Sequence, residues 1–230
     1  NVYDTLGRVQ TQTNAAGKVY NYYFAGSRSE EVDPNGFGKA SYFDALGKEL
    51  KAINQLGRVT TNTYDGQSRL TRKVFPEGNA LEYTYDDVTC KSADKRCTHN
   101  VSQVKQVPKS GSGLATLTSS FAYESAFNKV SSATDALGKV TSYTYTAQGE
   151  PLTVTAPADA AGVQPQTTYG YTAYSASGYP NFYLQTSQTR KIDASTSTVT
   201  TTTYATSNKY VPQIVVVDSG TGKLALATNF

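Results

Sequence analysis

A short motif recurs along the chain, and this recurrence limits the possible folds more than any other feature of the sequence. The motif YDTLGRV at residues 3–9 returns in altered form at residues 43–48, 54–59, 64–70 and 135–140. Its defining positions are Tyr3, Asp4, Gly7, Arg8, Asp44, Gly47, Gly57, Arg58, Tyr64, Asp65, Gly66, Asp135 and Gly138. Such self-similarity is typical of a repeat protein. It speaks against an enzyme, because a catalytic site needs unlike residues brought together once.

The segments between the motifs predict β-strands. Glycines recur at intervals of nine to twelve residues from Gly7 to Gly78, and the stretches between them are rich in Val, Thr and Tyr. Strands of about six residues with frequent turns are typical of an all-β meander. The chain has 18 Tyr and 38% hydrophobic residues, which favours thin antiparallel sheet layers over a thick core. The most helix-like stretch, residues 158–161, is too short to stand alone.

The turn residues have structural roles of their own. We expect Asn35-Gly36 and Asp65-Gly66 to form type I′ hairpin turns, which need positive φ at both central positions. In the Asp-x-Leu-Gly turns, the carboxylate can accept a bond from the N–H two residues on, and Gly can adopt the left-handed conformation. The Arg or Lys that follows can lie across the neighbouring strand with its head in solvent. The Tyr before Asp can bury its ring and donate its hydroxyl to a backbone carbonyl.

The regularity of the motif divides the chain. We treat residues 1–230 as a single β domain with regular repeats at 1–86 and 121–155. Residues 87–120 are interpreted as an insertion, and residues 156–230 as degenerate repeats. The chain contains no Met, so we expect it to be a processed piece of a longer protein.

The two cysteines, Cys90 and Cys97, flank six residues inside the predicted insertion, and His99 follows them. A short disulfide-closed loop suits an exported protein. Two free thiols and a metal site that includes His99 are the alternatives, although a pair of Cys with one His supplies only three zinc ligands at unusual spacing.

Several functions are disfavoured by what the sequence lacks. The net charge of +3 is not gathered into basic runs, so nucleic-acid binding is not indicated. No apolar run approaches the ~18 residues that a membrane span requires. Phosphate-loop and nucleophile-elbow motifs are absent from the sequence. The acidic pairs Glu30-Glu31 and Asp86-Asp87 place their carboxylates on opposite faces of a strand. We therefore predict no catalytic, cofactor-binding or metal-binding residues.

Aromatic residues gather where the repeat breaks down. The candidates for stacking on sugar rings are Tyr169, Tyr171, Tyr174, Tyr179 and Tyr183. A tyrosine ring offers flat apolar area with a polar tip, so glycans are possible ligands. The alternative is that these rings fill the space between sheet layers.

The series Tyr-Asp-x-x-Gly-Arg-Val, then Asn-x-x-Gly-Lys-Val, then Tyr, at steps of about ten residues, resembles the YD repeats of Rhs proteins. These repeats occur in bacterial Rhs polymorphic toxins, in the cocoon subunits of Tc toxins and in teneurins. Residues 1–86 and 121–155 match clearly, whereas residues 156–230 match loosely, with Tyr204 and Gly222 as weak anchors. The resemblance implies an antiparallel sheet that spirals into a curved open sheet or part of a hollow β-shell.

The resemblance also implies a function. Rhs and Tc shells enclose a C-terminal toxic polypeptide, so we expect a structural shell segment without catalysis of its own. Neighbouring YD repeats, the enclosed toxin and self-association through free sheet edges are the expected partners. The expected location is secreted, on a bacterial cell surface, or delivered by a secretion system. A cell-surface adhesion or carbohydrate-binding module is the alternative. The segment Asp33-Pro34-Asn35-Gly36 is similar to the family's self-cleavage terminator but lies among the first repeats, which favours a turn.

Overall fold

The chain folds almost entirely into antiparallel β-strands. The computed structural model describes residues 1–86, 95–174, 181–193, 195–205, 211–218 and 224–229. It divides into two compact units, Asn1–Ser119 (unit 1) and Ser120–Phe230 (unit 2). The all-β, antiparallel class predicted from the sequence is confirmed.

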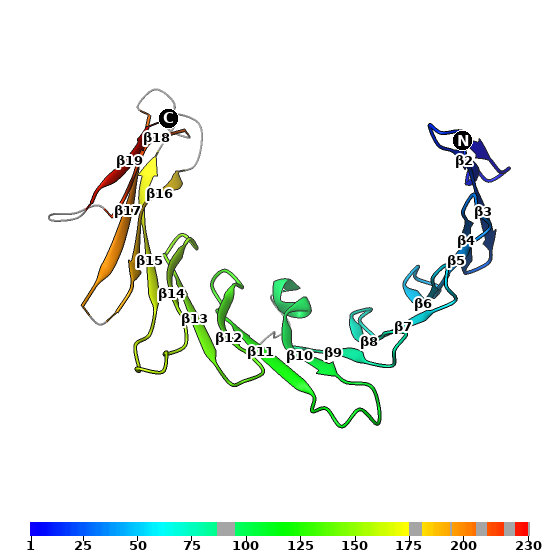
Figure 1. The fold of residues 1–230 in the computed structure, drawn as a ribbon, viewed down its shortest axis with the longest axis horizontal. Helices are drawn as coiled ribbons and strands as arrows, with labels where there is room; N and C mark the ends of the chain where they lie inside the picture. The colour runs from blue at the N-terminus through cyan, green and yellow to red at the C-terminus, as the bar shows by residue number, and fades with distance from the viewer. Residues whose placement is uncertain (87–94, 175–180, 194, 206–210, 219–223, 230) are drawn as a thin grey trace. The chain divides into compact units, whose positions relative to one another are not determined.

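Unit 1 is a meander in which each strand pairs with the next one in the sequence (Figure 1). Its elements are β1 Val2–Tyr3, β2 Val9–Thr13, β3 Val19–Ala25, β4 Arg28–Val32, β5 Gly38–Phe43, β6 Glu49–Ile53, β7 Val59–Tyr64, β8 Leu70–Val74, β9 Ala80–Tyr85, the short 3₁₀ helix η1 Lys95–His99, and β10 Val101–Val107. The segment interpreted as an insertion therefore contributes β10, which pairs with β9.

Unit 2 repeats the same arrangement with longer strands. Its elements are β11 Leu117–Tyr123 (which begins in unit 1), β12 Val130–Thr134, β13 Val140–Tyr145, β14 Pro151–Thr155, β15 Gln166–Tyr174, β16 Phe182–Lys191, β17 Ser197–Tyr204, β18 Pro212–Val217 and β19 Leu226–Asn229. Each pairs antiparallel with its successor from β11 to β19.

Most hairpins are closed by the same three-residue loop. Between β1 and β2, the Asp4 N–H donates to the Arg8 carbonyl at 2.9 Å, and the Gly7 N–H donates to the Asp4 carbonyl at 3.1 Å. Gly7 has a φ of 75°, and a left-handed residue at this position is common in such loops. The same pair of bonds recurs in the turns that begin at Asn14, Asp33, Asp44, Asn54, Asp65, Phe75, Asp135, Thr146 and Asp159.

The prediction of type I′ turns at Asn35-Gly36 and Asp65-Gly66 is wrong. In the first turn only Gly36 has a positive φ, and in the second the left-handed residue is Ser68, with a φ of 63°. The reason is that each loop is organised by the aspartate that precedes it, so the left-handed position falls three residues after Asp65 and not on Gly66.

Successive turns lie alternately at the two ends of each sheet. The motif copies at residues 3–9, 43–48 and 64–70 follow a strand that ends in Tyr or Phe, whereas those at 54–59 and 135–140 lie at the opposite end. We call the end of the sheet at which these strands finish in Tyr or Phe the tyrosine end. The motif copies that look equivalent in sequence therefore form two classes of turn.

A β-bulge follows most of the described turns at the tyrosine end. Tyr42 pairs with Lys51 but Phe43 pairs with Glu49, which leaves Leu50 unmatched. The same shift occurs beside Tyr3, Tyr64, Tyr123, Tyr145 and Tyr204. A bulge bends a strand and increases its twist, so these hairpins carry a recurrent distortion at one end, whereas the β3–β4 hairpin has none.

Neither unit has a thick core. Within the described ranges, Ala80 is the only buried apolar residue, and most other strand residues are half-buried. The accessible surface of the chain is 14967 Å², compared with roughly 10,000 Å² for a compact protein of this mass. Each unit is therefore a thin sheet, as the composition predicts.

Candidate functional site

The aspartates of the motif organise the turns. The Oδ1 atom of Asp4 accepts the N–H groups of Leu6 and Arg8, both at 2.9 Å, and its Oδ2 atom accepts the Arg8 Nε–H at 2.7 Å. The backbone N–H and the guanidinium of Arg8 hold the pKa of Asp4 below its usual value. Asp33, Asp44, Asp65 and Asp135 accept the same two N–H groups. Asp33 is therefore a turn residue like the others.

The tyrosines at the tyrosine end satisfy carbonyls that the strand ladder leaves open. The β6–β7 ladder ends at the pair Lys51–Thr61, and beyond it the Tyr64 hydroxyl donates to the Glu49 carbonyl at 3.1 Å. The same bond joins Tyr85 to Leu70 (2.9 Å), Tyr145 to Val130 (2.7 Å), Tyr171 to Pro151 (2.8 Å) and Tyr204 to Gln185 (2.9 Å). The bond expected for a Tyr before Asp is present at Tyr64 and Tyr85. The other three tyrosines make it without a following Asp. Each of these bonds joins a hairpin to the one before it.

Each of several cations covers the aromatic ring of the following hairpin. Arg8 lies 4.8 Å from the ring centre of Phe24, and Arg69 lies 4.5 Å from that of Tyr85. Lys48 and Tyr64 (5.9 Å) and Lys129 and Tyr145 (5.3 Å) repeat the contact. In all four pairs the ring follows the cation by 16 residues. The basic residue that follows the left-handed turn residue (Gly7, Gly47, Ser68 or Asn128) thus supplies a cation–π contact between hairpins.

Arg69 departs from the expectation that the basic head stays in solvent. Its side chain is 6% exposed, because three groups surround it. The guanidinium donates to Asp65 Oδ2 at 2.7 Å, stacks over Tyr85, and donates from Nη1 to the Thr98 carbonyl at 2.7 Å. Since Thr98 lies in η1, Arg69 ties this short helix to the turn between β7 and β8.

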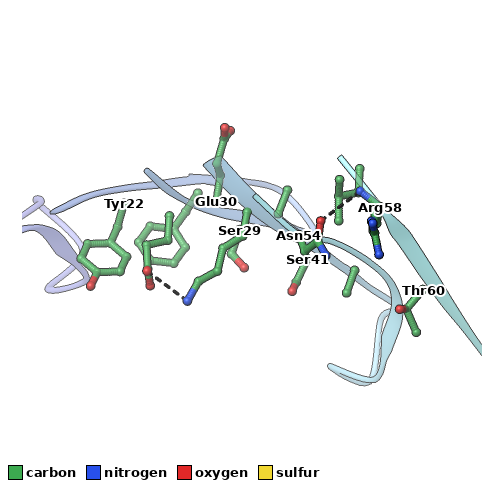
Figure 2. Close-up of a pocket in the computed structure, with 13 residues that line it drawn as sticks. Tyr22, Ser29, Glu30, Ser41, Asn54, Arg58 and Thr60 are labelled. Atoms are coloured by element: carbon green, nitrogen blue, oxygen red, sulfur yellow. Dashed lines mark hydrogen bonds and ion pairs between the residues drawn. The ribbon is translucent and has the colours of Figure 1, made fainter. Parts of the chain in front are cut away.

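A hollow of about 420 Å³ lies on one face of unit 1, across β3 to β7 (Figure 2). Its floor is a row of small side chains that face one another on adjacent strands: Ser29, Ser41, Ala52 and Thr60. Phe24, paired with Ser29, closes one end of this row. Glu30 points away from the hollow (Figure 2) and forms an ion pair with Arg28.

The charges beside this hollow neutralise one another. Lys39 Nζ lies 3.0 Å from Glu31 Oε1, and Arg58 Nη1 lies 3.1 Å from Glu77 Oε1. Ser41 donates its hydroxyl to Glu49 at 2.8 Å. The hollow therefore offers small hydroxyls and aromatic faces for binding, with no excess of either charge.

Four of the five tyrosines proposed to stack on sugars lie within the described residues. Tyr169 and Tyr171 line a second hollow of about 380 Å³ in unit 2, together with Tyr143 and Tyr145. Tyr174 stacks on Phe182 at 6.0 Å and meets the edge of Tyr204 at 6.4 Å. Tyr183 pairs with Ala173 across β15 and β16. Tyr179 lies outside the described residues.

The structure describes only one of the two cysteines of the predicted pair. Cys97 lies in η1 and has no free thiol. Cys90 lies outside the described residues, so the Cys90–Cys97 pairing stays a prediction. His99 Nδ1 lies 3.1 Å from the Thr98 hydroxyl, and the described ranges contain no cluster of His, Cys, Asp or Glu that could hold a metal ion.

A family model for the RHS repeat matches residues 125–163. This segment is thus similar to the RHS repeat. It contains β12, β13, β14 and the Lys129–Tyr145 contact. The resemblance carried by the motif is confirmed in this segment.

Three solved structures are similar to this chain. TcdB2-TccC3 without its hypervariable C-terminal region is 12% identical, with a TM-score of 0.46, over 99% of this chain and 15% of that one. The TcdB2-TccC3-Cdc42 structure gives 12% identity, a TM-score of 0.43 and the same coverage. The Photorhabdus luminescens Tc holotoxin pore gives 10% identity and a TM-score of 0.28, over 99% of this chain and 22% of that one. No curated protein matches. The chain thus spans less than a quarter of the length of these structures.

Sequence reasoning missed two parts of this arrangement. Tyr143 and Tyr145 enter the second hollow beside Tyr169 and Tyr171, and only the pairing of β13, β14 and β15 brings the four together. Arg69 reaches Thr98 from 29 positions away. The constant spacing of 16 residues between cation and ring is the one signal that could have been found in the sequence.

In the part of the chain that is described, no helix is long and apolar enough to cross a membrane.

Proposed function

We propose that the chain is a wall segment of an RHS-repeat shell that encloses a polypeptide cargo and performs no catalysis itself. The observation that carries this proposal is the thin repetitive sheet. Its backbone is secured by ladders and recurrent turns, yet among the described residues only Ala80 is a buried apolar residue. A sheet of this kind separates two spaces and leaves both faces available to other groups.

The proposed wall is held together by the same kinds of contact in several hairpins. Turn carboxylates accept backbone N–H groups, tyrosine hydroxyls close open carbonyls, and cations cover rings of the next hairpin. Each hairpin therefore obtains its packing from its neighbours, as in other repeat proteins. The proposed partners are further repeats of the same chain and an enclosed C-terminal toxin, and the proposed setting is export or delivery to another cell.

The proposal is tested by limited proteolysis of the longest natural chain that contains this sequence, with mass spectrometry of the surviving fragments. A container protects a C-terminal polypeptide in the native protein, and this polypeptide is digested only after unfolding. A matched pair of variants sharpens the result. Tyr145→Phe loses a bond between hairpins and should expose the cargo sooner, whereas Tyr143→Phe should not. If no segment is protected in the native protein, the shell proposal fails.

A further inference from the structure

The turn between β4 and β5 contains the single Asn-Gly step of the chain, at Asn35 and Gly36. Both residues are exposed, and nothing lies within 4 Å of the point where a Cβ on Gly36 would stand. Within the described residues, the Asn35 carboxamide makes no hydrogen bond. The carboxamide carbon of Asn35 and the backbone nitrogen that follows it are therefore open to solvent and uncrowded by side chains.

The asparagines that begin turns are placed differently. Oδ1 of Asn14 and Oδ1 of Asn54 each accept two backbone N–H groups, at 2.9 or 3.0 Å. A carboxamide held by these bonds is not free to approach the main chain. Each of the two also precedes a residue that has a side chain, which shields the next backbone nitrogen. Asn35 is thus the turn asparagine that combines a free carboxamide with a following glycine.

We propose that Asn35 is a site of spontaneous deamidation, a modification independent of the wall function. The Gly36 backbone nitrogen gives its proton to solvent base and attacks Cγ of Asn35. The new N–C bond forms, the bond from Cγ to the carboxamide nitrogen breaks, and that nitrogen takes a proton and leaves as ammonia. Water then opens the resulting succinimide at either carbonyl, which gives aspartate or isoaspartate. The reaction consumes water alone and needs neither an oxidant nor a metal ion.

The turn controls how often this reaction can begin. The Gly36 N–H donates to the Asp33 carbonyl at 2.9 Å, so its nitrogen cannot act as a nucleophile while the turn is closed. Asp33 Oδ1 accepts the N–H groups of Asn35 and Phe37, both at 2.9 Å, and holds the turn in this form. The reaction therefore proceeds from the opened turn, and its rate follows the population of the open form.

The isoaspartate product cannot return to the same turn. Its main chain is longer by a methylene group between residues 35 and 36, whereas the loop is closed by the Asp33 N–H bond to the Phe37 carbonyl at 2.9 Å. The new carboxylate also lies two residues from that of Asp33, and like charges repel. Deamidation to isoaspartate should therefore leave the turn between β4 and β5 permanently open.

Incubation of the whole chain at mildly alkaline pH tests the proposal, with peptide mapping by mass spectrometry and isoaspartyl methyltransferase labelling as readouts. We expect Asn35 to lose its amide while Asn14 and Asn54 keep theirs. Asp33→Ala removes the acceptor of two N–H groups that close the turn. This variant should convert Asn35 about five- to thirtyfold faster.

The matched control is Asp44→Ala, which removes the same two bonds from the next turn and should leave the rate at Asn35 unchanged. A free peptide of residues 30–40, in which the turn is open, confirms that the conditions support the reaction. The proposal is overturned if Asn35 keeps its amide in the native chain or if Asn14 or Asn54 converts as fast. Equal rates at Asn35 in the two alanine variants also overturn it.

Discussion

At the scale of the residue, each turn aspartate accepts hydrogen bonds from two backbone N–H groups. Asp44 Oδ1 accepts the N–H groups of Leu46 and Lys48, both at 2.8 Å. We expect Asp44→Ala to lower the free energy of unfolding by about 1–2 kcal/mol, since two N–H groups lose their acceptor. Urea denaturation measures this change.

The matched control for that substitution is Asp44→Asn. Asn14 and Asn54 accept the same two N–H groups in their own turns. The amide variant should therefore lose much less stability than the alanine variant. Equal losses in both would show that the carboxylate charge, and not the turn geometry, stabilises the hairpin.

The bridging tyrosines make the fold sensitive to alkali. Burial raises the pKa of Tyr64, Tyr85, Tyr145 and Tyr171 above the usual value. A raised folded-state pKa means that their contribution to stability is complete below about pH 10 and is lost as the pH rises through the folded-state pKa. Circular dichroism and phenolate absorbance, followed together during an alkaline titration, should show strand loss along with late ionisation. Full ionisation with the strands intact would contradict this account.

At the scale of the element, the tyrosine hydroxyls should stabilise the contact between hairpins. Tyr145→Phe removes the donor to the Val130 carbonyl and should cost about 1–2 kcal/mol, because that half-buried carbonyl loses its partner. Tyr143→Phe is the control, since Tyr143 lies two residues away on the same strand. Chemical denaturation of both variants separates a bond between hairpins from a general effect of losing a hydroxyl.

Arg69 joins three elements, and its loss should be more severe. Arg69→Met removes the guanidinium bonds to Asp65 Oδ2 and to the Thr98 carbonyl, in a site where the arginine is 6% exposed. We expect a loss of about 3 kcal/mol and faster amide exchange in η1. Arg58→Met removes a side chain that is 58% exposed and paired with Glu77, so it should cost at most about 1 kcal/mol. Similar losses in the two variants would argue against a role of Arg69 in holding η1 to the turn between β7 and β8.

At the scale of the whole molecule, the edge strands of a thin sheet can pair with other chains. β19 pairs with β18 on one side, and all four of its residues are exposed and uncharged. Edge strands without charge or proline readily pair with other chains. We expect concentration-dependent self-association of the chain in light scattering, reduced by Leu226→Lys. The substitution Leu6→Lys, at a turn leucine that is 75% exposed, is the control for added charge. A monomer at every concentration would refute this expectation.

The sequence by itself determined the elements that depend on local chemistry. The alternation of Val, Thr and Tyr gave strands, and Asp or Asn followed three residues later by Gly gave turns, because the side chain and the left-handed residue act within five positions. Composition predicted thin layers for the same reason, since 38% hydrophobic residues cannot fill a thick core. The RHS resemblance was visible wherever the motif kept its register.

Only the tertiary structure decided which end of the sheet each turn occupies and which side chains meet across strands. The motif copies at residues 43–48 and 54–59 look alike in sequence but lie at opposite ends, because the direction of a strand depends on how many strands precede it. The burial of Arg69 and the placement of Tyr143 and Tyr169 along one hollow depend on pairing register, and one bulge changes that register by a residue. Such contacts are set by the summed geometry of several hairpins, which no local pattern records.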